Sequence, residues 1–319
     1  MDTPNRILAL GILGTGHFGR FHALKAAANP RIRLVGLHDA DPARAAAVAA
    51  EARTTPMDAA SLIAAAEALI IAAPTRFHFA LAEAALAAGK HVFIEKPVAA
   101  TLAEADALIA AAAAGGRVLQ VGHIERFSAA FRAVTAAETG GRALSWDAVR
   151  AAPFRPRSLD VSVVLDLMIH DIDLVLELAE AMPEAIDAVG SAVASDRPDF
   201  AVARLRFPGG RAAVLTASRV SLAMERRLRV LGTEGEMSVN FLDRSLAVLR
   251  RGGAEPVATM PGSGIDRATW TDHDSLEAEQ AAFVAACLDG APVVVDGSAG
   301  RRALQVALAI EAAIAGGDA

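Results

Sequence analysis

The 319-residue chain lacks three features that would place it in other classes of protein. It has a single cysteine, Cys287, which excludes an internal disulfide and argues against a cysteine-based metal site. It has no dense Lys/Arg stripe, and a formal net charge of −6 argues against nucleic acid or an anionic membrane as the main partner. No uncharged apolar run approaches the roughly 18 residues of a membrane span, and no basic leader precedes the first glycine motif. We therefore expect a cytoplasmic protein without a metal site.

The composition and the order of patterns indicate two domains. The chain is 54% hydrophobic and 21% charged, which is typical of a soluble globular protein, and it is long enough for two cores. In the first part, short apolar runs such as RILALGIL, IRLVGLHD and HVFIEKP are each followed by a helical pattern. Strands that alternate with helices in this way predict a parallel sheet with helices on both faces.

After about residue 124 the pattern changes. A helical region near 162–181 is followed by runs of alternating character, separated by the turn signals FPGG, GTEG and RGGAEP. This pattern predicts a mostly antiparallel sheet. The expected fold is therefore α/β, with a doubly wound parallel sheet in residues 1–123 and an α+β domain with a large, mostly antiparallel open sheet in residues 124–319.

A glycine motif lies between the first strand and the first helix. Gly14, Gly16 and Gly19 have G-x-G-x-x-G spacing, which permits a tight turn and lets a pyrophosphate rest on the helix N-terminus. Asp39 stands 20 residues after Gly19, where a dinucleotide fold places the carboxylate that binds the adenosine ribose. That carboxylate repels the 2′-phosphate of NADP, and the nearby Arg44 moderates the repulsion. The motif therefore predicts a dinucleotide site and favours NAD.

The segment GKHVFIEKPVA places Glu95, Lys96 and Pro97 at the end of a parallel strand, where doubly wound folds build their sites. A lysine there faces the crevice. Near a positively charged nicotinamide its pKa falls, so it becomes usable for proton transfer. Lys96 is therefore a candidate catalytic residue.

The stretch SVVLDLMIHDIDLVLELAE is an apolar helix that carries four polar groups, each of which needs a partner if buried. At about 100° per residue, Asp166, His170 and Asp173 fall within roughly 60° of one another. Asp171 points about 100° away from His170, so we expect it on the outer face or as a cap. The narrow stripe indicates a helix that faces an active-site cleft. The alternative is a buried carboxylate–histidine pair in which the two groups only satisfy each other's hydrogen bonds and have no catalytic role.

Together these segments resemble the glucose–fructose oxidoreductase/inositol dehydrogenase/rhizopine catabolism (Gfo/Idh/MocA) family. The resemblance covers nearly the whole chain and rests on GILGTGHFG, AAPTRFHFALAEAALAAGKHVFIEKPVA, VGHIERF, LDLMIHDIDL and SLEAEQAAF. It implies an N-terminal Rossmann domain and a C-terminal domain whose sheet often forms an oligomer interface, so we expect a homodimer or homotetramer. It also implies that Lys96 is the catalytic lysine, His170 the histidine of a D-x-x-x-H motif, and Asp166 its companion.

The resemblance implies NAD-dependent oxidation of a secondary alcohol on a sugar ring. His170 or Lys96 takes the hydroxyl proton, the other polarises the oxygen, and both must reach the same hydroxyl. The sequence leaves these two roles open. The expected cofactor-binding residues are Gly14, Gly16, His17, Phe18, Gly19, Asp39, Pro74, Thr75, His78, Glu95 and Lys96. The expected substrate-binding residues are Lys96, His123, Glu125, Arg126, Arg155, Arg157, Asp166, His170 and Asp173.

Two segments narrow the choice of substrate. VGHIERFSAAF and DVSVVLDLMIHDIDLVLEL resemble the family branch that oxidises the 3-hydroxyl of UDP-N-acetylglucosamine. In that branch an aminotransferase receives the 3-keto product, on the way to the diamino sugar of some lipid A. One departure is that the usual NPA after ERF is SAA here, at 128–130. A second is that Met168 replaces a glycine common in the wider family, and this change agrees with the nucleotide-sugar branch.

Arg126, Arg155 and Arg157 are candidate diphosphate partners, because a guanidinium matches phosphate geometry. The alternatives are an inositol or free-sugar dehydrogenase of the same family, or a non-catalytic regulator that senses NAD and sugar. The presence of Lys96, Asp166 and His170 argues against the regulator.

Overall fold

The computed structural model describes residues 6–137, 143–156, 159, 161–271 and 273–316. The chain divides into two compact units, of which the first comprises residues 1–124 with 274–301 and the second residues 125–273 with 302–319. The first unit thus includes a segment from near the C-terminus, whereas the prediction divided the chain once, between 123 and 124. None of the described helices combines the length and the hydropathy that a membrane crossing requires.

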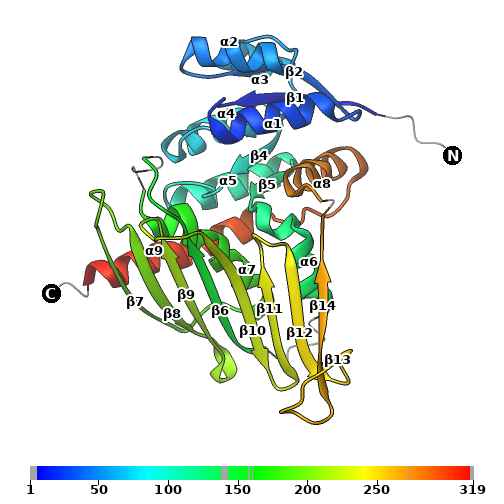
Figure 1. Cartoon of the computed structure of the whole chain (residues 1–319). Coiled ribbons are helices and arrows are strands. Elements are labelled where there is room, and N and C mark those ends of the chain that lie inside the picture. The colour runs from blue at the N-terminus through cyan, green and yellow to red at the C-terminus, as the bar shows by residue number, and fades with distance from the viewer. Residues whose placement is uncertain (1–5, 138–142, 157–158, 160, 272, 317–319) are drawn as a thin grey trace. The chain divides into compact units, whose positions relative to one another are not determined.

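The first unit is built on a five-stranded parallel sheet with the order β2-β1-β3-β4-β5 (Figure 1). Its strands are β1 (Leu8–Leu13), β2 (Ile32–His38), β3 (Ala68–Ile71), β4 (His91–Glu95) and β5 (Leu119–Gly122). Its helices are α1 (His17–Ala28), α2 (Pro42–Glu51), α3 (Ala59–Ala65), α4 (His78–Ala87), α5 (Leu102–Gly115) and α8 (Ser275–Asp289), with a 3-10 turn η1 (Thr75–Phe77). This arrangement confirms the predicted doubly wound sheet.

Helices cover both faces of this sheet, which explains its continuous apolar strands. Every residue of β1 and β3 is buried, as expected for parallel strands packed on both sides. Phe283 and Val284 of α8 belong to the same core as Phe93 of β4, and the two phenylalanine rings lie 5.8 Å apart. Packing of α8 therefore explains why residues 274–301 belong to the first unit.

The second unit contains a nine-stranded sheet with the order β13-β14-β12-β11-β10-β6-β9-β8-β7 (Figure 1). Its neighbouring strands are antiparallel except β6 and β9, which are parallel. The strands are β6 (Ala143–Ala151), β7 (Ala185–Ser191), β8 (Phe200–Arg206), β9 (Ala212–Ser218), β10 (Glu225–Gly232), β11 (Gly235–Asn240), β12 (Ser245–Arg251), β13 (Glu255–Pro256) and β14 (Ser263–Thr269). The predicted large, mostly antiparallel sheet is confirmed.

Helices cover one face of the nine-stranded sheet. They are α6 (Ala129–Ala137), α7 (Ile169–Ala179) and the part of α9 (Gly297–Gly316) that belongs to this unit, with shorter turns η2 (Ile124–Phe127), η3 (Val164–Met168) and η4 (Pro208–Gly210). Strand β8 shows the expected alternation, because Ala201, Ala203 and Leu205 are buried whereas Arg204 and Arg206 on the other face are exposed. The core of the unit therefore lies between this sheet and its helices.

Candidate active site

The glycine loop joins β1 to α1, and each of its three positions requires glycine for a different physical reason. Gly14 has a φ of +97°, and a Cβ there would lie 2.6 Å from the backbone of Ala72. A Cβ on Gly19 would overlap the carbonyl oxygen of Gly14. A Cβ on Gly16 would meet no atom within 4 Å, and Gly16 precedes α1 without a side-chain cap. Two glycines therefore serve the turn, and the third leaves the N–H groups at the start of α1 open to a pyrophosphate.

Asp39 directly follows β2, and its carboxylate is fixed by several donors. Thr15 donates to Oδ2 from its backbone N–H at 2.7 Å and from its hydroxyl at 2.9 Å. Arg44 donates to both carboxylate oxygens, at 3.2 and 2.6 Å. Partial burial alone would raise the pKa of Asp39, but hydrogen bonds from Arg44, the Asp41 amide and Thr15 hold it well below its usual range. An ionised, fixed carboxylate fits a ribose diol, which offers two O–H donors.

The other residues expected at the cofactor lie on two segments. His17 and Phe18 are exposed in the first turn of α1, where the His17 ring packs edge-on against Phe18 at 5.6 Å and against Phe21 at 5.0 Å. Pro74 precedes the turn η1, and Thr75 begins it. Both segments follow strands of the parallel sheet at their carboxyl ends, the edge at which doubly wound folds bind their ligands.

His78 is buried at the start of α4 and joins two loops at this edge. Its Nδ1 lies 2.8 Å from the carbonyl oxygen of Pro97, and its Nε2 lies 2.8 Å from that of Ala73. Burial lowers the pKa of His78, and the two carbonyl acceptors oppose this shift. The ring thus connects the loop after β3 to Pro97, the residue that follows Lys96, and this restricts the conformation of the backbone next to Lys96.

Lys96 directly follows β4 and is half-buried. The preceding residue, Glu95, has a carboxylate oxygen 2.8 Å from Nε2 of His22, and the peptide bond from Lys96 to Pro97 is cis. His123 comes just after β5 and is buried. The glycine loop, Lys96 and His123 therefore all lie beyond the carboxyl ends of the parallel strands.

In the second unit the predicted apolar helix begins as a π turn, η3, that continues into α7. The hydroxyl of Ser162 accepts hydrogen bonds from two backbone N–H groups of the π turn, at 3.2 and 3.3 Å. Asp166 is buried within this turn, and His170 is half-buried in the first turn of α7. Such π turns are rare and are frequently found at functional sites.

The prediction for Asp171 was wrong, because this residue does not lie on an outer face. Asp171 is buried, and its carboxylate accepts hydrogen bonds from Nε and Nη2 of Arg150 at 3.0 and 2.9 Å. Nη1 of Arg150 also donates to Glu125 at 2.8 Å. Burial opposes the charge on Arg150, but the two carboxylates raise its pKa above the ordinary value. Helix α7 is covered on almost every side, so Asp171 is paired with an arginine instead of water.

A second buried ion pair involves Arg126 and Asp173. Nε of Arg126 lies 3.1 Å from Oδ2 of Asp173, and its Nη1 lies 2.6 Å from Glu177. Both Arg126 and Asp173 are buried. The structure thus places two residues expected at the substrate, Arg126 and Asp173, next to each other, with the guanidinium engaged by carboxylates.

A pocket in the second unit brings Asp166 together with arginines that are distant in the sequence. It encloses about 590 Å³, including the part open to solvent, and its charged lining residues are Asp166, Arg150, Arg155, Arg219 and Arg226. Arg226 of β10 is the register partner of Arg150 in β6, and Arg219 directly follows β9, which is parallel to β6. The topology of the sheet therefore collects these arginines at one edge.

Similarity to known proteins agrees with this geometry. Residues 8–123 match the family model described as an oxidoreductase family with an NAD-binding Rossmann fold, and residues 120–238 match the GFO/IDH/MocA C-terminal domain. The chain belongs to the Gfo/Idh/MocA family. It is therefore an NAD-dependent oxidoreductase, and the expectation drawn from the motifs is confirmed.

Two relatives of this Gfo/Idh/MocA protein are informative. A UDP-N-acetylglucosamine 3-dehydrogenase of Acidithiobacillus ferrooxidans is 42% identical over 305 residues, which cover 95% of this chain and 96% of that protein. A solved structure of that enzyme has a TM-score of 0.91 and covers 96% of this chain and 97% of its own. An inositol 2-dehydrogenase of Rhizobium meliloti is 28% identical over 321 residues, with 93% of this chain and 94% of that protein covered.

The first unit of this family member fits NAD on its own geometry. The space beside Gly16 admits the pyrophosphate, and the fixed carboxylate of Asp39 suits the adenosine ribose. The loops at Thr75 and Lys96 follow the next strands of the same sheet edge. These residues would hold the cofactor.

Sequence reasoning missed three arginines of the pocket, namely Arg150, Arg219 and Arg226. Arg150 lies in β6, Arg226 in β10 and Arg219 just after β9. They share no motif or spacing, so the sequence contains no signal that joins them. Arg155 was predicted and is found exposed at the pocket. Arg157 lies outside the described residues.

Proposed function

We propose that this protein oxidises the 3-hydroxyl of UDP-N-acetylglucosamine, with NAD as the hydride acceptor. One observation carries the proposal: Asp166, the companion of the candidate catalytic histidine, shares its pocket with four arginines. A nucleoside diphosphate brings two anionic phosphates, and arginine is the side chain best matched to them. The similarity to the enzyme of Acidithiobacillus ferrooxidans supports the same substrate.

The charge balance of the pocket favours a diphosphate over a neutral polyol. Carboxylates already neutralise two of the arginines, since Arg150 pairs with Asp171 at 2.9 Å and Arg219 pairs with Asp199 at 2.7 Å. Arg155 is exposed at the pocket. An inositol has no anionic group for such a residue. We therefore assign Arg155 to the diphosphate.

The chemistry divides between the cofactor and the chain. NAD, when bound, supplies the acceptor for the hydride that leaves the sugar carbon. The chain must remove the hydroxyl proton and polarise the oxygen, and we assign these two tasks to Lys96 and His170. Asp166 lies one helical turn before His170 and orients its ring, because a carboxylate partner selects the tautomer of a histidine.

The chemistry of the product indicates which class of reaction follows. Oxidation leaves a ketone at C3, which an aminotransferase converts to an amine with glutamate as the donor. We propose such an aminotransferase as the downstream partner, in the synthesis of lipid A or a related surface polysaccharide in the cytoplasm. A homodimer or homotetramer stays a prediction.

The proposal is tested with purified protein, UDP-N-acetylglucosamine and NAD, with a sugar aminotransferase and glutamate present to remove the ketone. We expect NADH and an aminated nucleotide sugar. Lys96→Met should lower kcat by about 10²–10⁴-fold, because it removes a proton-transfer group, while NAD still binds. Free N-acetylglucosamine and myo-inositol are the comparison substrates.

The diphosphate assignment has its own control within this experiment. Arg155→Ala should raise KM for the nucleotide sugar by about 10-fold, the effect of one charge-assisted hydrogen bond, and leave kcat nearly unchanged. Arg197→Ala, at an exposed arginine that does not line the pocket, should leave KM as it is. Oxidation of myo-inositol without oxidation of the nucleotide sugar would contradict the proposal.

A further inference from the structure

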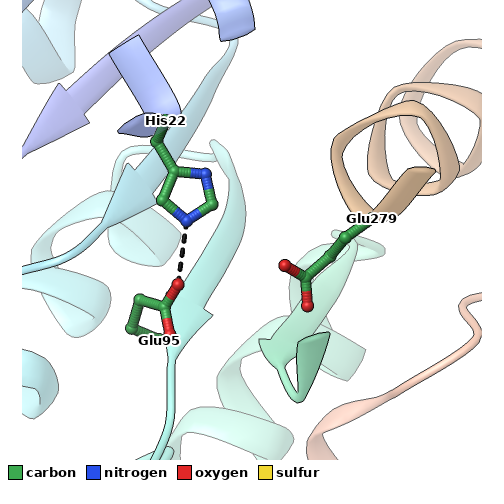
Figure 2. Close-up of side chains that lie close together, drawn as sticks. All are labelled: His22, Glu95 and Glu279. Atoms are coloured by element: carbon green, nitrogen blue, oxygen red, sulfur yellow. Dashed lines mark hydrogen bonds and ion pairs between the residues drawn. The ribbon is translucent and has the colours of Figure 1, made fainter. Parts of the chain in front are cut away.

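Three titratable side chains meet in the interior of the first unit. They are His22 of α1, Glu95 of β4 and Glu279 of α8, and their polar atoms lie within 4.8 Å of one another (Figure 2). His22 and Glu279 are completely buried, and the side chain of Glu95 is 12% exposed. Figure 2 shows the carboxylate of Glu279 directed from α8 toward the other two side chains.

The hydrogen bonds of His22 define its protonation. The amide nitrogen of Gln280 donates to Nδ1 of His22 at 2.9 Å and to the backbone carbonyl of His22 at 3.0 Å. Nδ1 is therefore an acceptor, so the ring proton resides on Nε2, which donates to Glu95 at 2.8 Å. His22 and Glu95 thus form a satisfied pair without a third group.

Glu279 has no comparable partner. Among the described residues, neither carboxylate oxygen of Glu279 has a hydrogen-bond partner, and no lysine or arginine pairs with it. Its backbone carbonyl, by contrast, accepts from Gln120 of β5 at 3.2 Å. A buried ionised carboxylate without a counter-charge is strongly disfavoured.

The groups that face Glu279 make ionisation harder still. The titratable ones are His22 from α1 and Glu95 from β4, and a carboxylate at Glu95 repels a second negative charge. Phe93, whose ring lies 5.1 Å from that of His22, adds apolar surface. Burial, and then the Glu95 carboxylate, raise the pKa of Glu279 well above its usual value.

We propose that Glu279 is a buried proton-binding site, held as a neutral carboxylic acid, and that it acts as a positioning residue for the His22–Glu95 pair. If Glu279 lost its proton, two carboxylates would compete for the single N–H of His22. Glu95 immediately precedes Lys96, so its release would free the end of β4 that presents the lysine. This consequence for Lys96 rests on the proposed function, whereas the proton site itself does not.

A divalent cation is the other way to neutralise such a cluster, and the geometry argues against it. Zn²⁺ binds nitrogen and oxygen ligands at about 2.0–2.2 Å, which sets tetrahedral ligands about 3.3 Å apart. The 2.8 Å between His22 and Glu95 is instead a hydrogen-bond distance. The nitrogen that faces the cluster also carries a proton and has no lone pair for a metal.

The first test uses the pH dependence of stability. The folded protein holds the Glu279 proton more tightly than the unfolded chain, so this stabilisation is full below the unfolded pKa and is lost as pH rises through the folded pKa. Between about pH 6 and about pH 9, the unfolding constant of the wild type should rise relative to that of Glu279→Gln by up to about 10-fold per pH unit. Glutamine keeps the shape and neutrality of the acid but cannot ionise.

Glu277→Gln is the matched control, because Glu277 is an exposed glutamate on the same helix, with a side chain 67% accessible. In urea unfolding it should keep the pH dependence of the wild type. If the ratio of unfolding constants for wild type and Glu279→Gln stayed constant over this pH range, Glu279 would not hold a proton. A stoichiometric divalent metal in the purified protein, with loss of stability on chelation, would also overturn the proposal.

The second test concerns the positioning role and uses the dehydrogenase reaction. Glu279→Ala should lower kcat by roughly 10-fold with little change in KM for NAD, because small displacements at a catalytic group reduce the rate steeply. Glu279→Gln should retain most of the wild-type kcat. At high pH, the plot of kcat against pH should show one ionisation fewer for this variant than for the wild type. An unchanged kcat in Glu279→Ala, or equal losses in both variants, would refute the positioning role. Failure to oxidise any sugar would refute the proposed function and leave the urea result intact.

Discussion

Asp39 and Arg44 carry opposite charges and are in direct contact at the position expected for the adenosine ribose. The carboxylate accepts two hydrogen bonds from the guanidinium, at 3.2 and 2.6 Å, so each residue holds the other in place. The carboxylate also repels a 2′-phosphate, whereas the guanidinium would attract one. We therefore expect the preference for NAD over NADP to depend on which of the two charges faces the ribose.

Asp39→Ser should lower kcat/KM for NAD by about 10–100-fold, the effect of losing a charged hydrogen-bond acceptor for the ribose diol. The same variant should gain activity with NADP, since Arg44 is then released to meet the 2′-phosphate. Steady-state kinetics with both cofactors measure the change. The double variant Asp39→Ser/Arg44→Ala should lose the gain with NADP, and an unaltered NAD/NADP ratio in Asp39→Ser would contradict this account.

Between elements, a buried ion pair connects α7 to the sheet. Asp171 of α7 and Arg150 of β6 share two hydrogen bonds, and both side chains are buried. Buried pairs of this kind are costly to break, because the partner that stays is left charged and unsolvated. The pair lies beside the pocket that contains Asp166, so it also supports the candidate site.

Asp171→Asn should lower the free energy of unfolding by about 3–5 kcal/mol, because the buried Arg150 then loses one of its two counter-charges. Replacement of both partners, as Arg150→Met/Asp171→Leu, should recover part of this loss. Urea unfolding monitored by circular dichroism measures both effects. Asp187→Asn, at an exposed aspartate of β7, serves as the control and should change stability by less than about 0.5 kcal/mol. Equal effects at Asp171 and Asp187 would show that the pair is unimportant.

At the scale of the whole molecule, the first unit is discontinuous in the sequence. Residues 274–301 return to it, and α8 contributes Phe283 and Val284 to a core that also contains Phe93. Gln280 of the same helix holds the ring of His22. The N-terminal segment therefore lacks part of its core until α8 packs.

A fragment of residues 1–124 should not unfold cooperatively, because buried side chains of this size contribute roughly 1.5–3 kcal/mol each. Residues 1–124 joined to 274–301 through a glycine–serine linker should regain a cooperative thermal transition and NAD binding. Calorimetry and fluorescence titration with NADH compare the two polypeptides. A fragment 1–124 that unfolds as cooperatively as the linked form would disprove this role of α8.

The sequence predicted those parts of the site that depend on local requirements. The glycine loop could be recognised because local geometry within one strand–turn–helix unit requires glycine at positions 14, 16 and 19. Asp39 and Lys96 could be placed because strand ends follow from the hydrophobic pattern, and the carboxyl ends of parallel strands lie at one edge. The predicted sheets are confirmed for the same reason, since periodicity reports which faces are buried.

The sequence determined the fold class, the family and the glycine loop, because each is recognised from patterns of residues that are close together in the chain. Only the tertiary structure decided the partners of buried charges. It turned Asp171 from an expected outer-face residue into the partner of Arg150, brought Arg150 and Arg226 into register across two strands, and placed Glu279 beside His22. The physical reason is that a buried charge is stabilised by whichever group the fold brings to it, and no spacing in the sequence records which group that will be.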